Sequence, residues 1–275
     1  DRYNNENKYL DDYYEGMRVG EIWGYETEGL FKDQADIDNH ATQKLIKSSS
    51  KNIWYPGDVK LKDQDGNGAI DYGTNRVDDH GDLKVIGNSL PRFAYSINLS
   101  GDWNNFFISA FFQGVGKQDW YPSSECIFWG QYNRPYNNLP TWHVDNYWTE
   151  DNQGAYLPRY AGYNTSIRDT KQTRYLQNVA YIRLKNLQFG YTLPKQWISK
   201  IMLQNARVYI SAENLWCWSP LYKHTRDLDV TNIYGSDPDL TDADMKSGLN
   251  GKRGSGDGNS YPQMRSISLG VSVTF

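Results

Sequence analysis

The last eleven residues of the chain alternate strictly between apolar and small polar side chains. Ile267, Leu269, Val271, Val273 and Phe275 occupy every second position, and serine, glycine and threonine occupy the positions between them. Successive side chains of a β-strand point to opposite faces of its sheet. The pattern therefore predicts a strand with one apolar face and one small, wettable face at the end of the chain.

Four further segments show the same alternation, at 93–100, 106–113, 179–193 and 206–211. A sixth, less regular strand is expected near 19–31. Each run approaches the length of a strand that crosses a thin bilayer at a tilt. The mean hydropathy is −0.78, and no run of about 18 apolar residues occurs, which excludes helical membrane spans. The chain is therefore expected to be all-β and antiparallel.

The links between these strands alternate between short and long. The short links are 101–105 and 194–205, and the long links are 32–90, 117–177 and 218–262. In outer-membrane β-barrels the periplasmic turns are short and the extracellular loops are long. The alternation predicts a transmembrane β-barrel segment with three extracellular loops and with Phe275 on the periplasmic side.

Six strands do not complete such a barrel, because bacterial single-chain barrels have about eight or more. An open sheet in lipid would leave unpaired backbone groups, each of which costs several kcal/mol of free energy. We therefore expect the chain to be one part of a larger barrel. The polar first residues carry no secretory signal, so a signal is expected to have been removed or to lie upstream.

Three basic residues test the membrane interpretation. Arg183, Lys185 and Arg265 share the parity of the apolar set, so they are expected to face lipid. A basic residue costs about 2–4 kcal/mol at the bilayer midplane and about 0–1 kcal/mol near the interface. All three lie at the outer ends of their strands, where either lipid headgroups or solvent would surround them at small cost.

Composition narrows the classes of function. Aromatic residues make up 15% of the chain, which fits either the aromatic girdles of a barrel or surfaces that stack on sugars. The net charge of −4 argues against a nucleic-acid partner, for which a basic face is expected. Cys126 and Cys217 are either a disulfide or, as their dissimilar contexts favour, two free thiols.

An ordered series of segments resembles the C-terminal part of SusC/RagA-type TonB-linked outer-membrane transporters, and the resemblance covers nearly the whole chain. Two of its motifs are Asp63-Gln-Asp-Gly-Asn-Gly-Ala-Ile-Asp71 and Tyr181-Ile-Arg-Leu-Lys-Asn-Leu-Gln-Phe-Gly-Tyr-Thr-Leu-Pro194. The other segments are 19–29, 56–60, 85–88, 91–93, 111–116, 207–215 and the terminal Phe275. Each segment is weak alone, but their order and spacing are specific.

The resemblance implies a longer protein with a plug inside a 22-stranded barrel, of which this chain supplies the C-terminal strands. It implies import of oligosaccharides, or of peptides in some members, across the outer membrane. The implied partners are a SusD-like surface lipoprotein, the remainder of the barrel, outer-membrane lipid, and TonB through the missing N-terminal part.

The segment from 63 to 71 also matches the first nine positions of an EF-hand-type calcium loop. Its predicted ligands are side-chain oxygens of Asp63, Asp65, Asn67 and Asp71 and the carbonyl oxygen of Ala69. Thr74 stands where a closing glutamate is expected. The resemblance puts the closing carboxylate at Asp82, with Asp78 and Asp79 as alternatives. The competing interpretation is an acidic, glycine-rich turn that binds nothing, and in either case the role would be structural.

The link 117–177 is dense in aromatic residues. Trp120, Tyr121, Trp129 and Tyr132 are candidate substrate-binding residues, because flat rings stack on sugar faces or cradle a peptide. The alternative is that they form the small core that a loop of this length needs. Tyr136, Trp142, Tyr147 and Trp148 belong to the same group.

Nothing in the sequence indicates catalysis. Nucleophile-elbow, Cys-x-x-Cys and phosphate-loop motifs are absent, and the four histidines are scattered over predicted loops, where we expect them to be exposed. Paired carboxylates such as Asp78 with Asp79, or Asp237 with Asp239, are interpreted as solvated charge. The alternative to a transporter is a soluble or surface-attached all-β module that binds carbohydrate, and solubility would separate the two. Whether the ligand is glycan or peptide is not encoded in a readable motif.

Overall fold

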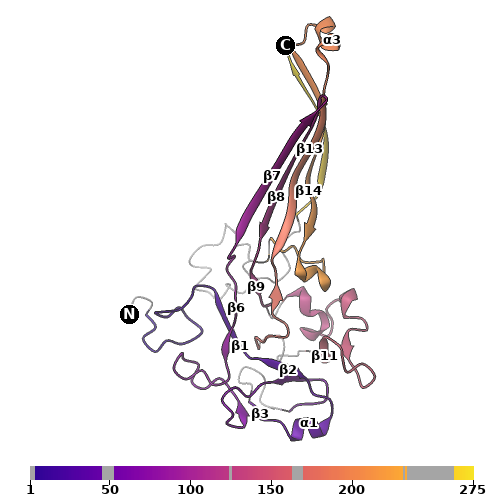
Figure 1. The fold of residues 1–275 in the computed structure, drawn as a ribbon. Coiled ribbons are helices and arrows are strands. Elements are labelled where there is room, and N and C mark those ends of the chain that lie inside the picture. Colours follow the sequence, from indigo (N-terminus) through magenta and orange to yellow (C-terminus); the bar gives the residue numbers. More distant parts are fainter. Residues whose placement is uncertain (1–3, 45–52, 124–125, 163–169, 232, 234–262) are drawn as a thin grey trace. The chain divides into compact units, whose positions relative to one another are not determined.

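The structure is a computed structural model that describes residues 4–44, 53–123, 126–162, 170–231, 233 and 263–275 (Figure 1). The chain divides into two compact units, which are described separately. Unit 1 consists of Asp1–Leu90, Asp119–Gln177 and His224–Ser260, and unit 2 consists of Pro91–Gln118, Asn178–Lys223 and Tyr261–Phe275. Within the described residues, no helix has both the length and the apolar character that a membrane span requires.

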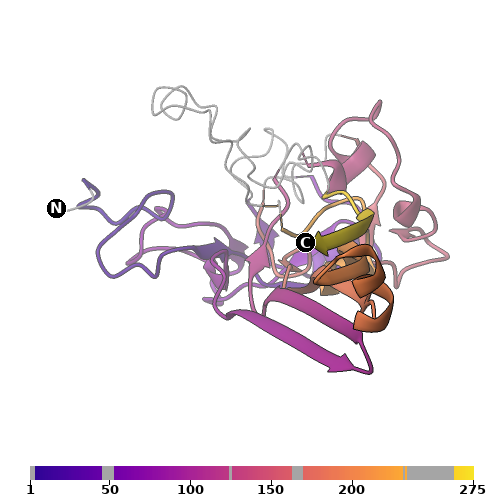
Figure 2. The ribbon, with the colours of Figure 1, turned by 90° about the horizontal axis from the view of Figure 1, so that it is seen from above.

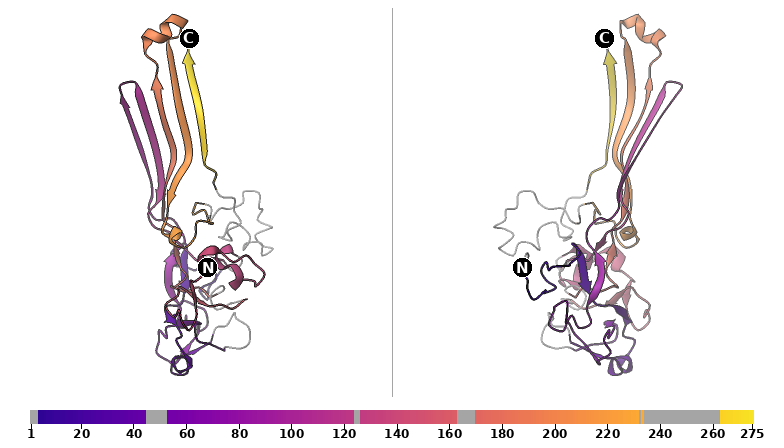
Figure 3. Two further views of the ribbon diagram at one scale, coloured as in Figure 1. Left: turned by 90° about the vertical axis from the view of Figure 1, so that its right-hand side faces the viewer. Right: turned by 60° about the vertical axis from the view of Figure 1, so that its left-hand side comes forward.

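Unit 2 is built on one sheet of five antiparallel strands in the order β15-β14-β13-β8-β7 (Figures 1 and 3). The strands are β7 (Ala94–Trp103), β8 (Phe106–Val115), β13 (Tyr181–Thr192), β14 (Asn205–Trp218) and β15 (Ser266–Thr274). They correspond to the five regularly alternating runs of the sequence, and the all-β prediction is confirmed. Figure 2 views this sheet end-on, with the β7–β8 hairpin in magenta and β15 in yellow.

Two short connections lie at the end of the sheet that also carries the C-terminus (Figure 3). Asn104 and Asn105 join β7 to β8, and both have positive φ, at 49° and 70°. Two left-handed residues between paired strands match the twist of a hairpin, and asparagine tolerates that conformation. β13 and β14 are joined by α3 (Lys195–Ile198) and a 3₁₀ turn, η3 (Ser199–Ile201). A second 3₁₀ turn, η4 (Pro220–Lys223), follows β14.

A bulge in β13 corrects the expectation for Arg183. Leu184 and Asn186 of β13 pair with Phe112 and Phe111, which are consecutive on β8, so Lys185 is an extra residue relative to β8. An extra residue reverses the parity of every side chain beyond it. Arg183 therefore pairs with Gln113 and Cys217 on the small, polar face, and the prediction that it faces lipid is wrong.

The guanidinium of Arg183 and the ammonium of Lys185 both donate to the side-chain oxygen of Gln263, the latter at 3.2 Å. These two basic groups are thus tied to the segment that leads into β15. Arg265 is exposed at the start of that segment.

Unit 1 consists of short elements joined by long irregular segments. Its strands are β1 (Glu21–Gly24), β2 (Thr27–Leu30), β3 (Thr42–Gln43), β4 (Val59–Leu61), β5 (Ala69–Ile70), β6 (Lys84–Asn88), β9 (Asp119–Trp120), β10 (Tyr147–Trp148), β11 (Leu157–Arg159) and, at its boundary, β12 (Gln177–Asn178). Its helices are α1 (Gln34–Asp38) and the 3₁₀ helices η1 (Ile127–Tyr132) and η2 (Thr141–His143). The three predicted loops supply most of this unit.

The predicted sixth strand at 19–31 is not part of the five-stranded sheet. The segment forms β1, which pairs with β6, and β2, which pairs with β4. Its Glu26 interrupts the alternation, and the Glu26 carboxylate accepts hydrogen bonds from Lys84 at 2.5 Å and Gln64 at 2.8 Å. Polar pairing of this kind belongs to a folded loop and not to a membrane strand.

A buried ion pair fastens two of the long links to each other. Arg159 Nε donates to Asp58 Oδ1 at 2.7 Å, and the Arg159 guanidinium lies 4.5 Å from the centre of the Tyr55 ring. Desolvation raises the pKa of the Asp58 carboxyl, although Arg159 and the N–H of Tyr55 act in the opposite direction. The pair thus fixes the mutual position of links 32–90 and 117–177, at a desolvation cost that Arg159 partly offsets.

Candidate functional site

The apolar face of the sheet in unit 2 is exposed across all five strands. Two of its most exposed members lie on β15, where Ile267 is 71% and Leu269 is 76% exposed. The same face exposes Ile97, Leu99, Ile108, Phe189, Val208 and Ile210. Soluble monomers rarely expose an apolar surface that is continuous over so many strands, and such a surface marks contact with lipid or with another protein.

Rows of aromatic side chains bound this apolar face at both ends. Directly paired residues place Trp103, Phe106 and Tyr191 in one row, where the Phe106 and Tyr191 rings are 4.7 Å apart. A second row, through Gly114 of β8, places Tyr95 and Trp218 at its two ends.

Eight positions along β8 separate these rows, which is roughly 26 Å at about 3.3 Å per residue. Membrane barrels carry an apolar band about 25 Å tall between aromatic girdles. A tilt of the strands would shorten the projected height. The face therefore has the dimensions of a membrane-spanning surface.

The opposite face combines small and polar residues with two large rings. One row of paired residues runs Phe107, Gly190, Tyr209 and Gly270. A Cβ atom on Gly190 would collide with the Phe107 ring, and one on Gly270 would collide with the Tyr209 ring. Each ring thus lies across a glycine of the next strand, and the glycines are needed for this close approach.

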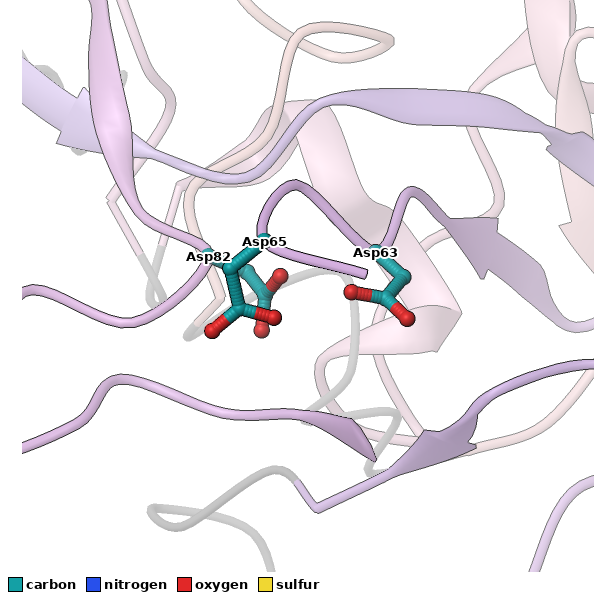
Figure 4. Close-up of side chains that lie close together, drawn as sticks. All are labelled: Asp63, Asp65 and Asp82. Atoms are coloured by element: carbon teal, nitrogen blue, oxygen red, sulfur yellow. The ribbon is translucent and has the colours of Figure 1, made fainter. Parts of the chain in front are cut away.

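In unit 1, the acidic segment predicted to bind calcium brings three carboxylates together. Oxygen atoms of Asp63, Asp65 and Asp82 all lie within 4.8 Å of one another (Figure 4). Asp63 accepts hydrogen bonds from the backbone N–H groups of Gly66 at 2.7 Å and Gly68 at 2.9 Å. These bonds, chiefly that from Gly68, hold the pKa of the Asp63 carboxyl below its ordinary value.

Asp82 is the buried member of this cluster. Its two carboxylate oxygens accept from the N–H groups of Gln64 at 2.6 Å and Asp71 at 2.9 Å. The Asp82 side chain therefore joins the two ends of the acidic segment, as the closing carboxylate of a cation loop would.

Asp78 and Asp79, the alternative closing carboxylates, are not members of this cluster. The Thr74 N–H donates to the carboxylate of Asp79 at 3.1 Å, and Asp78 pairs with Arg76 at 3.6 Å. Asn67 accepts from the N–H of Ala69 at 2.8 Å, and Asp71 accepts from the N–H of Gly73 at 2.9 Å. The carboxylate of Asp71 is not part of the three-carboxylate cluster. The roles of Asn67, Ala69 and Asp71 as ligands stay predictions.

The four candidate substrate-binding residues are all buried in unit 1. Trp129 packs edge-to-face on Phe128 and on Tyr175, with ring centres 5.1 Å and 5.6 Å away. Tyr132 donates to the carbonyl oxygen of Pro158 at 2.7 Å, and Tyr121 donates to that of Thr170 at 3.0 Å. Their present contacts, like those of Trp120 with Phe128, are those of a core. Contact of these rings with a ligand stays a prediction.

The rings that unit 1 presents at its surface are different ones. Tyr136, Tyr147 and Tyr160 are exposed, and the Tyr160 hydroxyl donates to the side chain of Gln131 at 2.6 Å. Tyr160 lies outside the dense aromatic run of the sequence. It directly follows the short strand β11, in which both Leu157 and Pro158 are buried, so no alternation in the sequence marks its exposure.

The expectation of exposed histidines is wrong for His143, which is 1% exposed. Its Nε2 lies 2.9 Å from the carbonyl oxygen of Phe128, so the neutral ring carries its proton there. Among the described residues Nδ1 has no hydrogen-bond partner. Burial therefore lowers the pKa of His143 to about 4.

We expect this histidine to make unit 1 sensitive to acid. Between the ordinary pKa of about 6.5 and the lowered value, the unfolded segment binds more protons than the folded one, so stability falls as pH falls. The full effect is about 3 kcal/mol below both values. Protection factors of the amides of residues 126–148, which correct for the slower intrinsic exchange in acid, should fall over this interval, and a His143→Gln variant should lose most of that pH dependence. Equal pH dependence in both proteins would contradict this assignment.

Comparison with known proteins supports the family resemblance that the sequence shows. No protein-family model matches the chain. TonB-dependent receptor P3 of Formosa agariphila is 30% identical over 266 residues, which cover 95% of this chain and 22% of that receptor. TonB-dependent receptor P26 of the same organism is 26% identical over 260 residues, which cover 94% of this chain and 23% of the receptor.

Among solved structures, the RagAB peptide transporter is 19% identical and covers 75% of this chain and 20% of its own, with a TM-score of 0.48. The RagAB peptide importer in the open-open state is 18% identical and covers 72% and 19%, with a TM-score of 0.43.

The chain spans between a fifth and a quarter of the length of the curated relatives that it matches. The matched region is nearly the whole of this chain. The alignment therefore agrees with the predicted resemblance to TonB-linked outer-membrane transporters. This chain belongs to the TonB-dependent receptors.

Proposed function

We propose that this chain forms part of an outer-membrane importer, with its five-stranded sheet in the membrane and unit 1 outside the cell. The observation that carries the proposal is the exposed apolar face of the sheet, bounded by two aromatic rows. The relatives that match this chain are named as TonB-dependent receptors. In such a barrel the chain would end on the periplasmic side.

The cargo proposed for the whole importer is an oligosaccharide or a peptide. Energy would come through TonB, by way of the part of the receptor that precedes this segment. A SusD-like lipoprotein would close over the mouth of the barrel. Unit 1, with its aromatic core and its surface tyrosines, would contribute to the extracellular chamber.

Uptake by cells tests this function. The intact receptor should be deleted from its host and uptake of labelled oligosaccharides and labelled peptides compared with the parent strain. We expect loss of uptake for one of these two classes, restored by the intact gene and abolished by a protonophore. Unchanged uptake of both classes, together with recovery of the protein in the soluble fraction, would favour a soluble carbohydrate-binding module instead.

We also propose that the acidic segment of unit 1 binds one calcium ion in a structural role. Three carboxylates held this close repel one another, and a calcium ion prefers such a set of oxygen ligands. Asp63, Asp65 and Asp82 would be direct ligands, with Asn67, Ala69 and Asp71 completing the shell. The ion would fasten residue 63 to residue 82 and stiffen the link 32–90.

Calcium titration of the intact receptor tests the site. Loss of even an outer-shell partner costs a metal site about 10–100-fold in affinity, so Asp63→Ala combined with Asp65→Ala should abolish the binding heat. Asp78→Ala is the matched control, because this exposed carboxylate of the same segment lies outside the cluster. Identical heats in all three proteins would remove the site.

A further inference from the structure

We infer that the connection between β13 and β14 is an anchor for anionic phospholipid at the membrane surface. The connection comprises α3, η3 and Met202, and the inference rests on the proposed membrane location of the sheet. The inference assigns a lipid partner to the β13–β14 connection, which has no role in the proposed uptake of cargo.

The position of the connection along the strands is the first argument. The aromatic row through Trp103, Phe106 and Tyr191 ends the apolar face. The connection begins at Lys195, four residues after Tyr191, and β14 begins at Asn205, so the connection lies just beyond that row. Aromatic rows mark the level at which the hydrocarbon gives way to headgroups. The connection is therefore at headgroup level.

Burial shows on which face of the sheet the connection lies. Ala206 shares the apolar face with Val208 and Ile210, which are exposed, but Ala206 is almost fully covered. α3 contacts β14, and its Ile198 is also buried. We interpret this as α3 covering the end of the apolar face, which turns the outer side of the helix toward lipid.

The outer side carries two large apolar side chains that nothing in unit 2 covers. Trp197 is 62% exposed and Met202 is 88% exposed. Met202 adopts a left-handed conformation with φ of 59°, which costs free energy in a residue other than glycine. Trp197 and Met202 would insert at the boundary of the hydrocarbon, where tryptophan is favoured.

Charge identifies the kind of headgroup. The connection contains Lys195 and Lys200, both exposed, and no acidic residue between 193 and 204. Exposed lysines beside inserted apolar side chains attract anionic lipid, with an effect of about fivefold in affinity for each basic residue. The other short connection, Asn104 and Asn105, carries no lysine, so the feature distinguishes the β13–β14 connection from it.

Spin-label depth measurements on the intact receptor in vesicles test the anchor. Nitroxides are attached at Trp197→Cys, Met202→Cys, Leu269→Cys and Glu6→Cys, each with the native cysteines replaced by serine. Accessibility to oxygen reports lipid and accessibility to a neutral nickel chelate reports water. The vesicles are phosphatidylcholine with or without phosphatidylglycerol. All four positions are exposed, so labels there are expected to leave the fold intact.

The anchor predicts that labels at 197 and 202 lose nickel accessibility relative to the label at residue 6, which reports solvent. Labels at 197 and 202 that match the label at 6, while the label at 269 reports lipid, would overturn the anchor alone. A label at 269 that reports water would overturn the membrane location itself, and the anchor with it.

Headgroup preference is measured separately, by native mass spectrometry of lipid retained on the receptor. Lys195→Gln combined with Lys200→Gln should lower the preference for phosphatidylglycerol over phosphatidylcholine by about fivefold for each lysine lost. An unchanged preference would overturn the role of the lysines and leave protein contact as the better explanation of this surface.

Discussion

Replacing Trp129 by alanine is expected to destabilise unit 1 by about 3–5 kcal/mol, the usual cost of removing a buried tryptophan. Trp129 is 0% exposed, lies between Phe128 and Tyr175, and donates from Nε1 to the carbonyl oxygen of Ser123 at 3.0 Å. The substitution would leave a cavity in the centre of the link 117–177. Urea-dependent proteolysis of this link in the intact receptor measures the loss.

Tyr136→Ala is the matched control for this measurement. Tyr136 belongs to the same aromatic link but is 72% exposed, so its loss should change stability by less than about 0.5 kcal/mol. The pair of variants also separates the two interpretations of the aromatic link. A Trp129 variant that stays stable but loses ligand uptake would contradict the core role and support direct contact with the ligand.

The second large effect is expected in the sheet. Ile267, Ala212, Leu187, Ala110 and Leu99 form the row midway between the two aromatic rows. If this face meets lipid, Ile267→Arg puts a charge inside the apolar band, at a cost of up to about 2–4 kcal/mol. Ser268 is the next residue and points to the opposite face, so Ser268→Arg avoids that cost.

The sheet was predictable because its two faces differ in chemistry along every strand. Alternation of period two located five strands, because neighbours such as Leu269 and Ser268 face opposite sides, and the segment 101–105 was predicted as a short link. The same rule failed at Lys185, because a bulge leaves no mark in the pattern of apolar and polar residues. The consequence was the wrong face for Arg183.

Unit 1 was much less predictable from the sequence than the sheet of unit 2. Its strands have two to five residues, so periodicity could not place them, and the irregular run at 19–31 was assigned to the membrane sheet. The sequence offered packing as one role for Trp120, Tyr121, Trp129 and Tyr132, but not which rings would be buried. Burial depends on contacts between segments distant in the chain, such as Tyr132 with Pro158.

The cluster of Asp63, Asp65 and Asp82 was only partly predictable from the sequence. The spacing of Asp63 and Asp65 was readable as a cation loop, because turn residues and oxygen ligands recur at fixed intervals there. The closing carboxylate could not be predicted from the spacing of the motif, because an insertion separates Asp82 from it. Only the resemblance to a family, and then the fold of the link, directed attention to Asp82.

We propose that the apolar face of the five-stranded sheet meets membrane lipid. The most direct test compares the intact receptor with its Ile267→Arg and Ser268→Arg variants, measured as the heat-modifiable folded barrel recovered in the outer-membrane fraction. We expect a marked loss of folded barrel for Ile267→Arg and recovery close to wild type for Ser268→Arg. Equal recovery of the two variants, or a greater loss for Ser268→Arg, would contradict it.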